Sequence, residues 1–132
     1  MSRGGLEFRI PESTQITFKA GAGIKALVAA ADRDAVVGVP VVISGAGEVD
    51  LGTDGDTAFG FIDVYEMDGH CSVQIDKIRD DVPIGAVAPT VGKIVAVDGT
   101  GKIKDSSTTA KLRTPVVLAV NETNKVATVF LG

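Results

Sequence analysis

Glycine-containing turns interrupt this sequence at short intervals, and the runs between them are dominated by valine, isoleucine and alanine. The chain has 132 residues, of which 16 are glycine and only 5% are aromatic. Valine and isoleucine are typical of strands, and glycine supplies the positive φ angles of tight turns. The turn signals recur at spacings found in sandwiches and small barrels. The sequence therefore predicts one mainly β domain with roughly eight to eleven short strands.

The clearest hairpin signal is the dipeptide Asp68-Gly69 between two apolar segments. Asp-Gly favours the turn that joins two antiparallel strands directly. Similar patterns of strand, turn and strand occur along the rest of the chain. The predicted strand segments are 35–43 and 48–51, 58–65 and 71–75, 93–97 and 102–104, and 115–120 and 125–131. Segment 24–31 fits a short helix or a strand, because its alanines favour a helix but its polar and glycine flanks leave little length, and we predict a strand.

The N-terminal region contains two alternating runs of apolar and polar residues. Residues 6–10 read Leu-Glu-Phe-Arg-Ile before Pro11, and a second run covers 15–19. This pattern predicts an extended arm over residues 1–19 and a single β domain over residues 20–132. Such an arm can add a strand to the exposed sheet edge of a partner. The same pattern also fits the first strand of the domain's own sheet. The residues predicted to contact a partner are Leu6, Phe8, Arg9, Ile10, Ile16 and Phe18.

Charge and hydropathy exclude several classes of partner. The formal net charge is −4, whereas a nucleic-acid-binding protein needs a basic patch, so no nucleic acid is expected. The longest apolar stretches are far shorter than the roughly 20 residues of a membrane helix, so no membrane is expected. The first residues lack the apolar region of a secretory signal, so export is not expected. The single cysteine excludes an intramolecular disulfide.

The sequence carries no signature of an enzyme. His70 and Cys71 are the only histidine and cysteine. Neighbours on a strand point to opposite faces, so this pair makes a poor nucleophile and base. A zinc site would need four ligands of these types, which one chain does not supply. No Gly-x-Ser-x-Gly motif and no complete phosphate-binding loop are present. We therefore expect no catalysis, no bound metal and no cofactor.

Four acidic residues form the densest charged cluster: Asp50, Asp54, Asp56 and Asp63. Their spacing does not match a calcium-binding loop, which places its ligands at alternate positions and ends with a glutamate. A solvated loop of turn-forming residues is the favoured interpretation. The alternative is a weak cation site in the β-barrel domain of a cellular enzyme or carrier.

The order of apolar blocks and turns over about residues 20–132 resembles that of tailed-phage capsid decoration proteins, the head-cement proteins that include the lambda-like head decoration type. The blocks are 60–64 (Gly-Phe-Ile-Asp-Val), 73–75 (Val-Gln-Ile), 91–103, 115–120 (Pro-Val-Val-Leu-Ala-Val) and 129–131 (Val-Phe-Leu). The resemblance lies in this pattern and not in a short signature motif.

The resemblance implies a compact β-barrel-like or β-tulip domain with an extended N-terminal arm. It implies a virion protein that is made in the bacterial cytoplasm and binds the outer surface of the expanded capsid. There it would bridge neighbouring subunits of the major capsid protein, often as a homotrimer, and stabilise the shell. By position, residues 2–19 would correspond to the segment that pairs with capsid strands. A phage tail or fibre module of similar composition is a further alternative.

Overall fold

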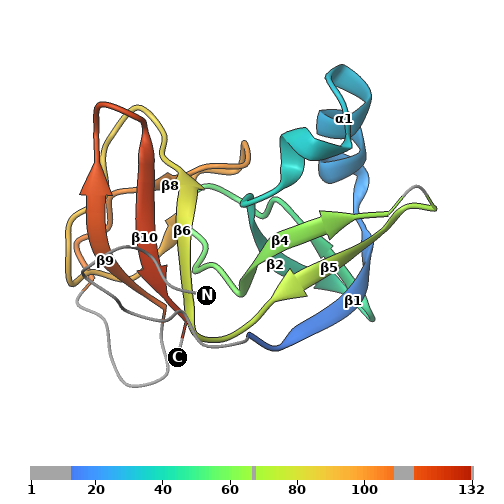
Figure 1. The fold of residues 1–132 in the computed structure, drawn as a ribbon, viewed down its shortest axis with the longest axis horizontal. Coiled ribbons are helices and arrows are strands. Elements are labelled where there is room, and N and C mark those ends of the chain that lie inside the picture. The colour runs from blue at the N-terminus through green and yellow to red at the C-terminus, as the bar shows by residue number, and fades with distance from the viewer. Residues whose placement is uncertain (1–12, 67, 109–114, 132) are drawn as a thin grey trace, which may run out of the picture.

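The computed structural model describes residues 13–66, 68–108 and 115–131. This part of the chain is mainly β, as the sequence predicts. It contains a closed barrel of five strands, a three-stranded sheet and a two-stranded sheet. Figure 1 shows the barrel on one side of the molecule, with helix α1 above it, and the two smaller sheets on the other side.

Ten strands are formed by the described residues, which is within the predicted range. The barrel has the order β1-β3-β2-β4-β5, and the smaller sheets have the orders β6-β10-β9 and β7-β8. The strands are β1 (Gln15–Ala20), β2 (Pro40–Gly45), β3 (Glu48–Asp50), β4 (Gly60–Tyr65), β5 (His70–Gln74), β6 (Ile78–Pro83), β7 (Ala96–Val97), β8 (Ile103–Lys104), β9 (Val116–Asn121) and β10 (Val126–Phe130). The helices are α1 (Ala22–Ala30) and the 3-10 helix η1 (Arg33–Val36).

The four predicted pairs of neighbouring strands are present. β4 and β5 pair antiparallel on either side of the predicted Asp68-Gly69 turn, where Gly69 has a φ of 90°. The pairs β2 with β3, β7 with β8 and β9 with β10 are also antiparallel. Two details differ from the prediction: the 35–43 segment begins with η1, and β6 was not predicted at all.

The predicted strand at 24–31 is wrong, because these residues belong to α1. Asp50, at the end of β3, accepts hydrogen bonds from the backbone N–H groups of Gly23 (3.3 Å) and Ile24 (3.1 Å). A carboxylate in this position also complements the positive end of the helix dipole. A Cβ on Gly21 would overlap the Asp50 carboxylate, which explains the glycine before the helix. The helix thus depends on a residue distant in sequence.

We expect Asp50→Ala to lower the free energy of unfolding by about 1–2 kcal/mol, the usual cost of losing a helix N-cap. The measurement is urea unfolding followed by circular dichroism. Asp80→Ala is the control, because the Asp80 side chain is exposed and makes no hydrogen bond or ion pair to the described residues. Equal stability of Asp50→Ala and the parent chain would contradict this role of Asp50.

The predicted boundary between arm and body needs correction. Residues 15–19, assigned to the arm, lie in β1, which pairs with β5 from Gln15 to Lys19 and with β3 at Lys19 and Ala20. The alternative that an alternating run forms a strand of the domain's own sheet is therefore right for 15–19. Residues 1–12 lie outside the described residues.

The buried side chains form two clusters. The first fills the barrel beneath α1 and contains Ile24, Val41 and Val73, all fully buried. The second is formed mainly by residues of the two smaller sheets and the segments beside them. Phe61 belongs to β4 in the barrel, but its side chain is fully buried in the second cluster. Phe61 therefore couples the packing of the two halves.

A polar network also connects the barrel to the three-stranded sheet. Arg79 on β6 lies 2.6 Å from the Asp63 carboxylate on β4 and donates to the Gln74 side chain at 3.3 Å. Asp63 also accepts a hydrogen bond of 2.8 Å from the side chain of Gln15 on β1. Gln74 is only 4% exposed, and its amide group donates to two backbone carbonyls. Each member of this network therefore has a partner.

Candidate functional site

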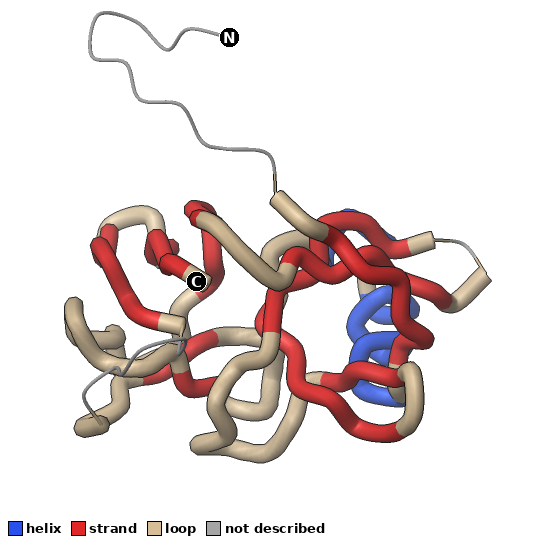
Figure 2. Tube along the Cα trace, turned by 90° about the horizontal axis from the view of Figure 1, so that it is seen from below, coloured by secondary structure: helices blue, strands red, loops and turns tan. Residues whose placement is uncertain are grey.

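The barrel exposes apolar side chains near the end where β1 begins. Side chains alternate along a strand, so Ile16 and Phe18 lie on the same face of β1 as buried Ala20. That face is the inside of the barrel. Figures 1 and 2 show α1 at the end of the barrel where β1 finishes, so Ile16 and Phe18 lie away from the helix.

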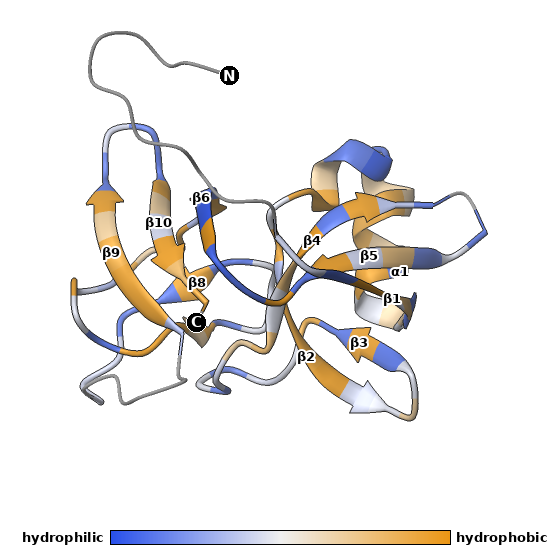
Figure 3. Ribbon diagram, turned by 60° about the horizontal axis from the view of Figure 1, so that its bottom comes forward, coloured by the Kyte–Doolittle hydropathy of each residue, from blue (hydrophilic) through white to orange (hydrophobic). Residues whose placement is uncertain are grey.

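Phe59 extends this apolar surface, and Ile43 is exposed on the same inner face of the barrel. Phe59, just before β4, packs edge-on against Phe18, with ring centroids 5.8 Å apart. Ile43 on β2 pairs with Val49, which in turn pairs with Ala20, so Ile43 shares the inner face. Ile16, Ile43 and Phe59 are 41%, 50% and 37% exposed. We call Ile16, Phe18, Ile43 and Phe59 the barrel-mouth patch. Figure 3 shows the alternation of hydrophilic and hydrophobic segments along β1 and the apolar run in β2.

The N-terminal segment joins the barrel beside this patch. The Thr14 N–H donates a 2.6 Å hydrogen bond to the Asp76 carboxylate, and the Thr14 carbonyl accepts one of 3.1 Å from Ile75. The Thr14 N–H is the main cause that lowers the pKa of Asp76 below its usual range. Thr14 is therefore held against β5 at the point where the described chain enters β1.

The structure brings together two of the six predicted contact residues. Ile16 and Phe18 lie in the barrel-mouth patch, and the other four lie outside the described residues. Sequence reasoning missed Ile43 and Phe59, because both occur in apolar runs that resemble buried strands. The sequence signal that could have identified Phe59 is its position directly before Gly60, because aromatic residues are rare in this chain.

The neighbouring His70 and Cys71 side chains lie in different environments. Cys71 is fully buried in the barrel core, and burial raises the pKa of its thiol to about 11. His70 is 43% exposed, and its Nδ1 lies 3.2 Å from an Asp68 carboxylate oxygen in the hairpin turn. The Cys71 thiol therefore stays protonated at neutral pH and is a poor nucleophile.

The four carboxylates of the acidic cluster have separate roles. Asp50 caps α1, and Asp63 pairs with Arg79. Asp54 pairs with Lys104 at 2.9 Å, and Asp56 accepts a hydrogen bond from the Thr53 N–H. Within the described ranges, no group of three or more acidic, histidine or cysteine side chains is arranged to hold a metal ion. The cation-site alternative therefore gains no support from these four residues.

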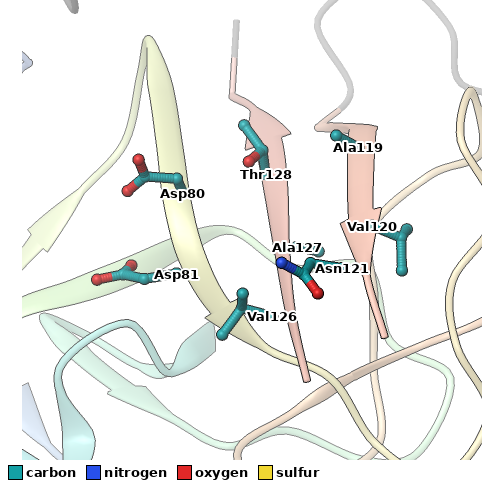
Figure 4. A pocket seen from close by; sticks show the side chains of 8 residues that line it. All are labelled: Asp80, Asp81, Ala119, Val120, Asn121, Val126, Ala127 and Thr128. Carbon is teal, nitrogen blue, oxygen red and sulfur yellow. The ribbon is translucent and has the colours of Figure 1, made fainter. Parts of the chain in front are cut away.

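A second surface feature is a hollow of about 350 Å³ on the outer face of the three-stranded sheet. In β6, Asp80 and Asp81 together oppose the single residue Thr128 of β10, which is a β-bulge, and Asp81 has a φ of 57°. The register between β10 and β9 also shifts beside Thr128. Figure 4 shows Asp80, Asp81 and Thr128 with their side chains on the same side of the sheet. The hollow is shallow and open, and its lining includes no pair suited to catalysis.

No helix in the described part of the chain has the length and apolar content needed to cross a membrane. Comparison of the chain with family models, with curated proteins and with solved structures finds no match.

Proposed function

We propose that the protein is a capsid decoration protein that binds the outer surface of an expanded phage head and bridges neighbouring major capsid subunits. The observation that carries this proposal is the exposed barrel-mouth patch at the point where the N-terminal segment enters the barrel. Exposed apolar side chains that gather at one place are typical of protein interaction sites. The order of apolar blocks that resembles decoration proteins supports the same function.

In this proposal, the barrel-mouth patch and the N-terminal segment contact the capsid together. Leu6, Phe8 and Ile10 of the segment would contact apolar pockets, and Arg9 would contact polar groups between them. One copy would bind weakly through such a small surface. A homotrimer whose copies contact adjacent subunits would gain effective concentration and hold the subunits together.

The test is co-sedimentation of the purified protein with expanded, undecorated heads of the phage that encodes it, with unexpanded procapsids as the comparison. We expect saturable binding to expanded heads only. Absence of binding to both shells would contradict the proposal and favour a tail or fibre module.

The contribution of the patch is tested with Ile43→Asp. Ile43 is 50% exposed, so a carboxylate there is expected to leave the fold intact but to weaken head binding by about tenfold or more, because a charge would be buried in the interface. Val87→Asp is the matched control, since Val87 is 61% exposed and lies outside the patch. Equal binding of the two variants would remove the patch from the proposed interface.

A further inference from the structure

Two hollows of opposite charge adjoin on the three-stranded sheet. The lining of the hollow described above includes Asp80 and Asp81 and, among the described residues, no basic side chain (Figure 4). A second hollow, of about 420 Å³, lies at the end of β6 and is lined by Lys102 and Lys125, with no acidic side chain from the described ranges. We call them the acidic hollow and the basic hollow. A basic hollow is unexpected in a chain with 17 acidic and 13 basic residues.

The two hollows meet at one pair of neighbouring residues. Pro83 on β6 and Val126 on β10 are partners in the antiparallel register, so their side chains lie on the same face of the sheet. Val126 lines the acidic hollow, and Pro83 lines the basic hollow. Opposite charges therefore lie side by side on one surface of the molecule.

The charged groups of the basic hollow are held in place but are not neutralised. The Lys125 carbonyl accepts a 3.1 Å hydrogen bond from the Ile84 N–H, and the Lys102 carbonyl accepts one of 2.9 Å from the Asp98 N–H. Both lysine side chains are exposed and make no hydrogen bond or ion pair to the described residues. Two positive charges that line one hollow repel each other, and a negatively charged partner removes this repulsion.

Lys125 also has a backbone conformation that favours other residue types. Its φ is 58°, in the left-handed region, where glycine has no strained Cβ and asparagine and aspartate are tolerated better than lysine. The turn alone therefore does not explain a lysine at this position. Residues held in such conformations occur preferentially at binding positions.

The acidic hollow keeps a negative charge after its ion pairs are counted. Arg79 lies 2.6 Å from the Asp63 carboxylate and 3.3 Å from that of Asp81. The Asp80 side chain makes no hydrogen bond or ion pair to the described residues. These three carboxylates and one guanidinium leave a net charge of −2, which matches the two lysines of the basic hollow.

We propose that this surface binds a second copy of the chain, with the acidic hollow of each copy against the basic hollow of the other. Because the two hollows adjoin, one two-fold rotation forms both contacts and closes the pair. Asp80 of each copy then faces Lys125 of the other. The contact uses none of the barrel-mouth patch and does not depend on the proposed capsid binding. The pair is an assembly of the free protein, separate from the trimer proposed on the head.

The first test is sedimentation velocity of the free full chain over a range of concentrations. At about 0.1 M salt the Debye length is about 10 Å, so the net charges of two copies are mostly screened while the contacts between hollows are not. We expect an equilibrium between monomer and dimer. In about 1 M salt, where the Debye length is about 3 Å, the Kd of the dimer should rise by about tenfold or more.

The second test reverses the charges. Asp80→Lys and Lys125→Asp are each expected to raise the Kd of the dimer by about tenfold or more, because like charges then face each other. Aspartate tolerates the left-handed conformation, so Lys125→Asp keeps the turn. Both changes in one chain, or an equal mixture of the two single variants, should restore most of the dimer, because every reversed group then meets an opposite charge.

Two variants control for the change in net charge. Lys25→Asp on α1 and Asp34→Lys on η1 make the same charge changes at exposed side chains outside both hollows. Each should leave the Kd of the dimer within about twofold of that of the parent chain, since distant exposed charges are screened. Circular dichroism of every variant checks that the fold is intact.

Four results would overturn the inference: monomers at every concentration in the lower salt, equal dimer formation in both single-reversal variants, a double variant that associates as weakly as the single ones, or growth beyond the dimer. Neither test uses phage heads. Their failure would leave the capsid proposal to be decided by co-sedimentation, and failure of co-sedimentation would leave this pairing to be decided by sedimentation velocity.

Discussion

Replacing Phe61 with alanine is expected to lower the free energy of unfolding by about 3–5 kcal/mol, the range found when a buried phenylalanine is truncated. Phe61 is the largest fully buried side chain and lies between the barrel and the smaller sheets. Its removal leaves a cavity that rigid strands on both sides cannot easily fill. A small domain has total stability of about 5–15 kcal/mol, so this loss would bring the chain close to unfolding at room temperature.

Guanidinium unfolding of Phe61→Ala measures this loss. Because Phe61 packs against both halves, we expect one transition at a lower denaturant concentration, with circular dichroism and Cys71 accessibility changing together. Val87→Ala is the control, since Val87 is 61% exposed. Two separate transitions, with the barrel as stable as in the parent chain, would show that the two halves fold independently.

Arg79→Ala is expected to be the next most destabilising change, by about 2–3 kcal/mol, because it leaves charged and polar groups unpaired. The Arg79 side chain is 10% exposed. Its removal would leave the Asp63 carboxylate and the side-chain oxygen of Gln74 without their hydrogen bonds from the guanidinium group. Asp63 is 32% exposed, so water compensates part of the loss and the effect stays below that of a fully buried pair.

The comparison with Arg79→Lys separates charge from geometry. Lysine keeps the charge but cannot reach Asp63, Asp81 and Gln74 together, as the planar guanidinium does at 2.6, 3.3 and 3.3 Å. We expect Arg79→Lys to recover less than half of the stability lost in Arg79→Ala. Complete recovery in urea unfolding would show that charge alone matters at this position.

Local chemistry made the hairpins predictable from the sequence. The Asp68-Gly69 turn and the alternation of the strands around it require only neighbouring residues. Helix α1 was not predictable in this way, because its N-terminus is capped by Asp50, which lies 26 residues from Ile24. β6 was missed because its bulge places two consecutive aspartates in the strand and interrupts the alternation.

The candidate site was only half predictable for a related reason. Ile16 and Phe18 stood out because they alternate with polar residues in a short isolated run. Ile43 follows two valines and has the pattern of a buried strand. Its exposure depends on the tertiary structure, since Val41 two residues earlier in the same strand is fully buried whereas Ile43 is 50% exposed. No single-segment pattern contains this information.

The two irregularities beside Thr128 have a consequence for the behaviour of the protein at high concentration. Flat, regular sheet edges recruit further chains and begin ordered aggregates. Here both outer strands of the three-stranded sheet lose register with β10 near its middle, and β6 carries two exposed carboxylates at that point. An incoming strand would meet a bent edge and negative charge. This sheet is therefore protected against fibrous self-association at high protein concentration.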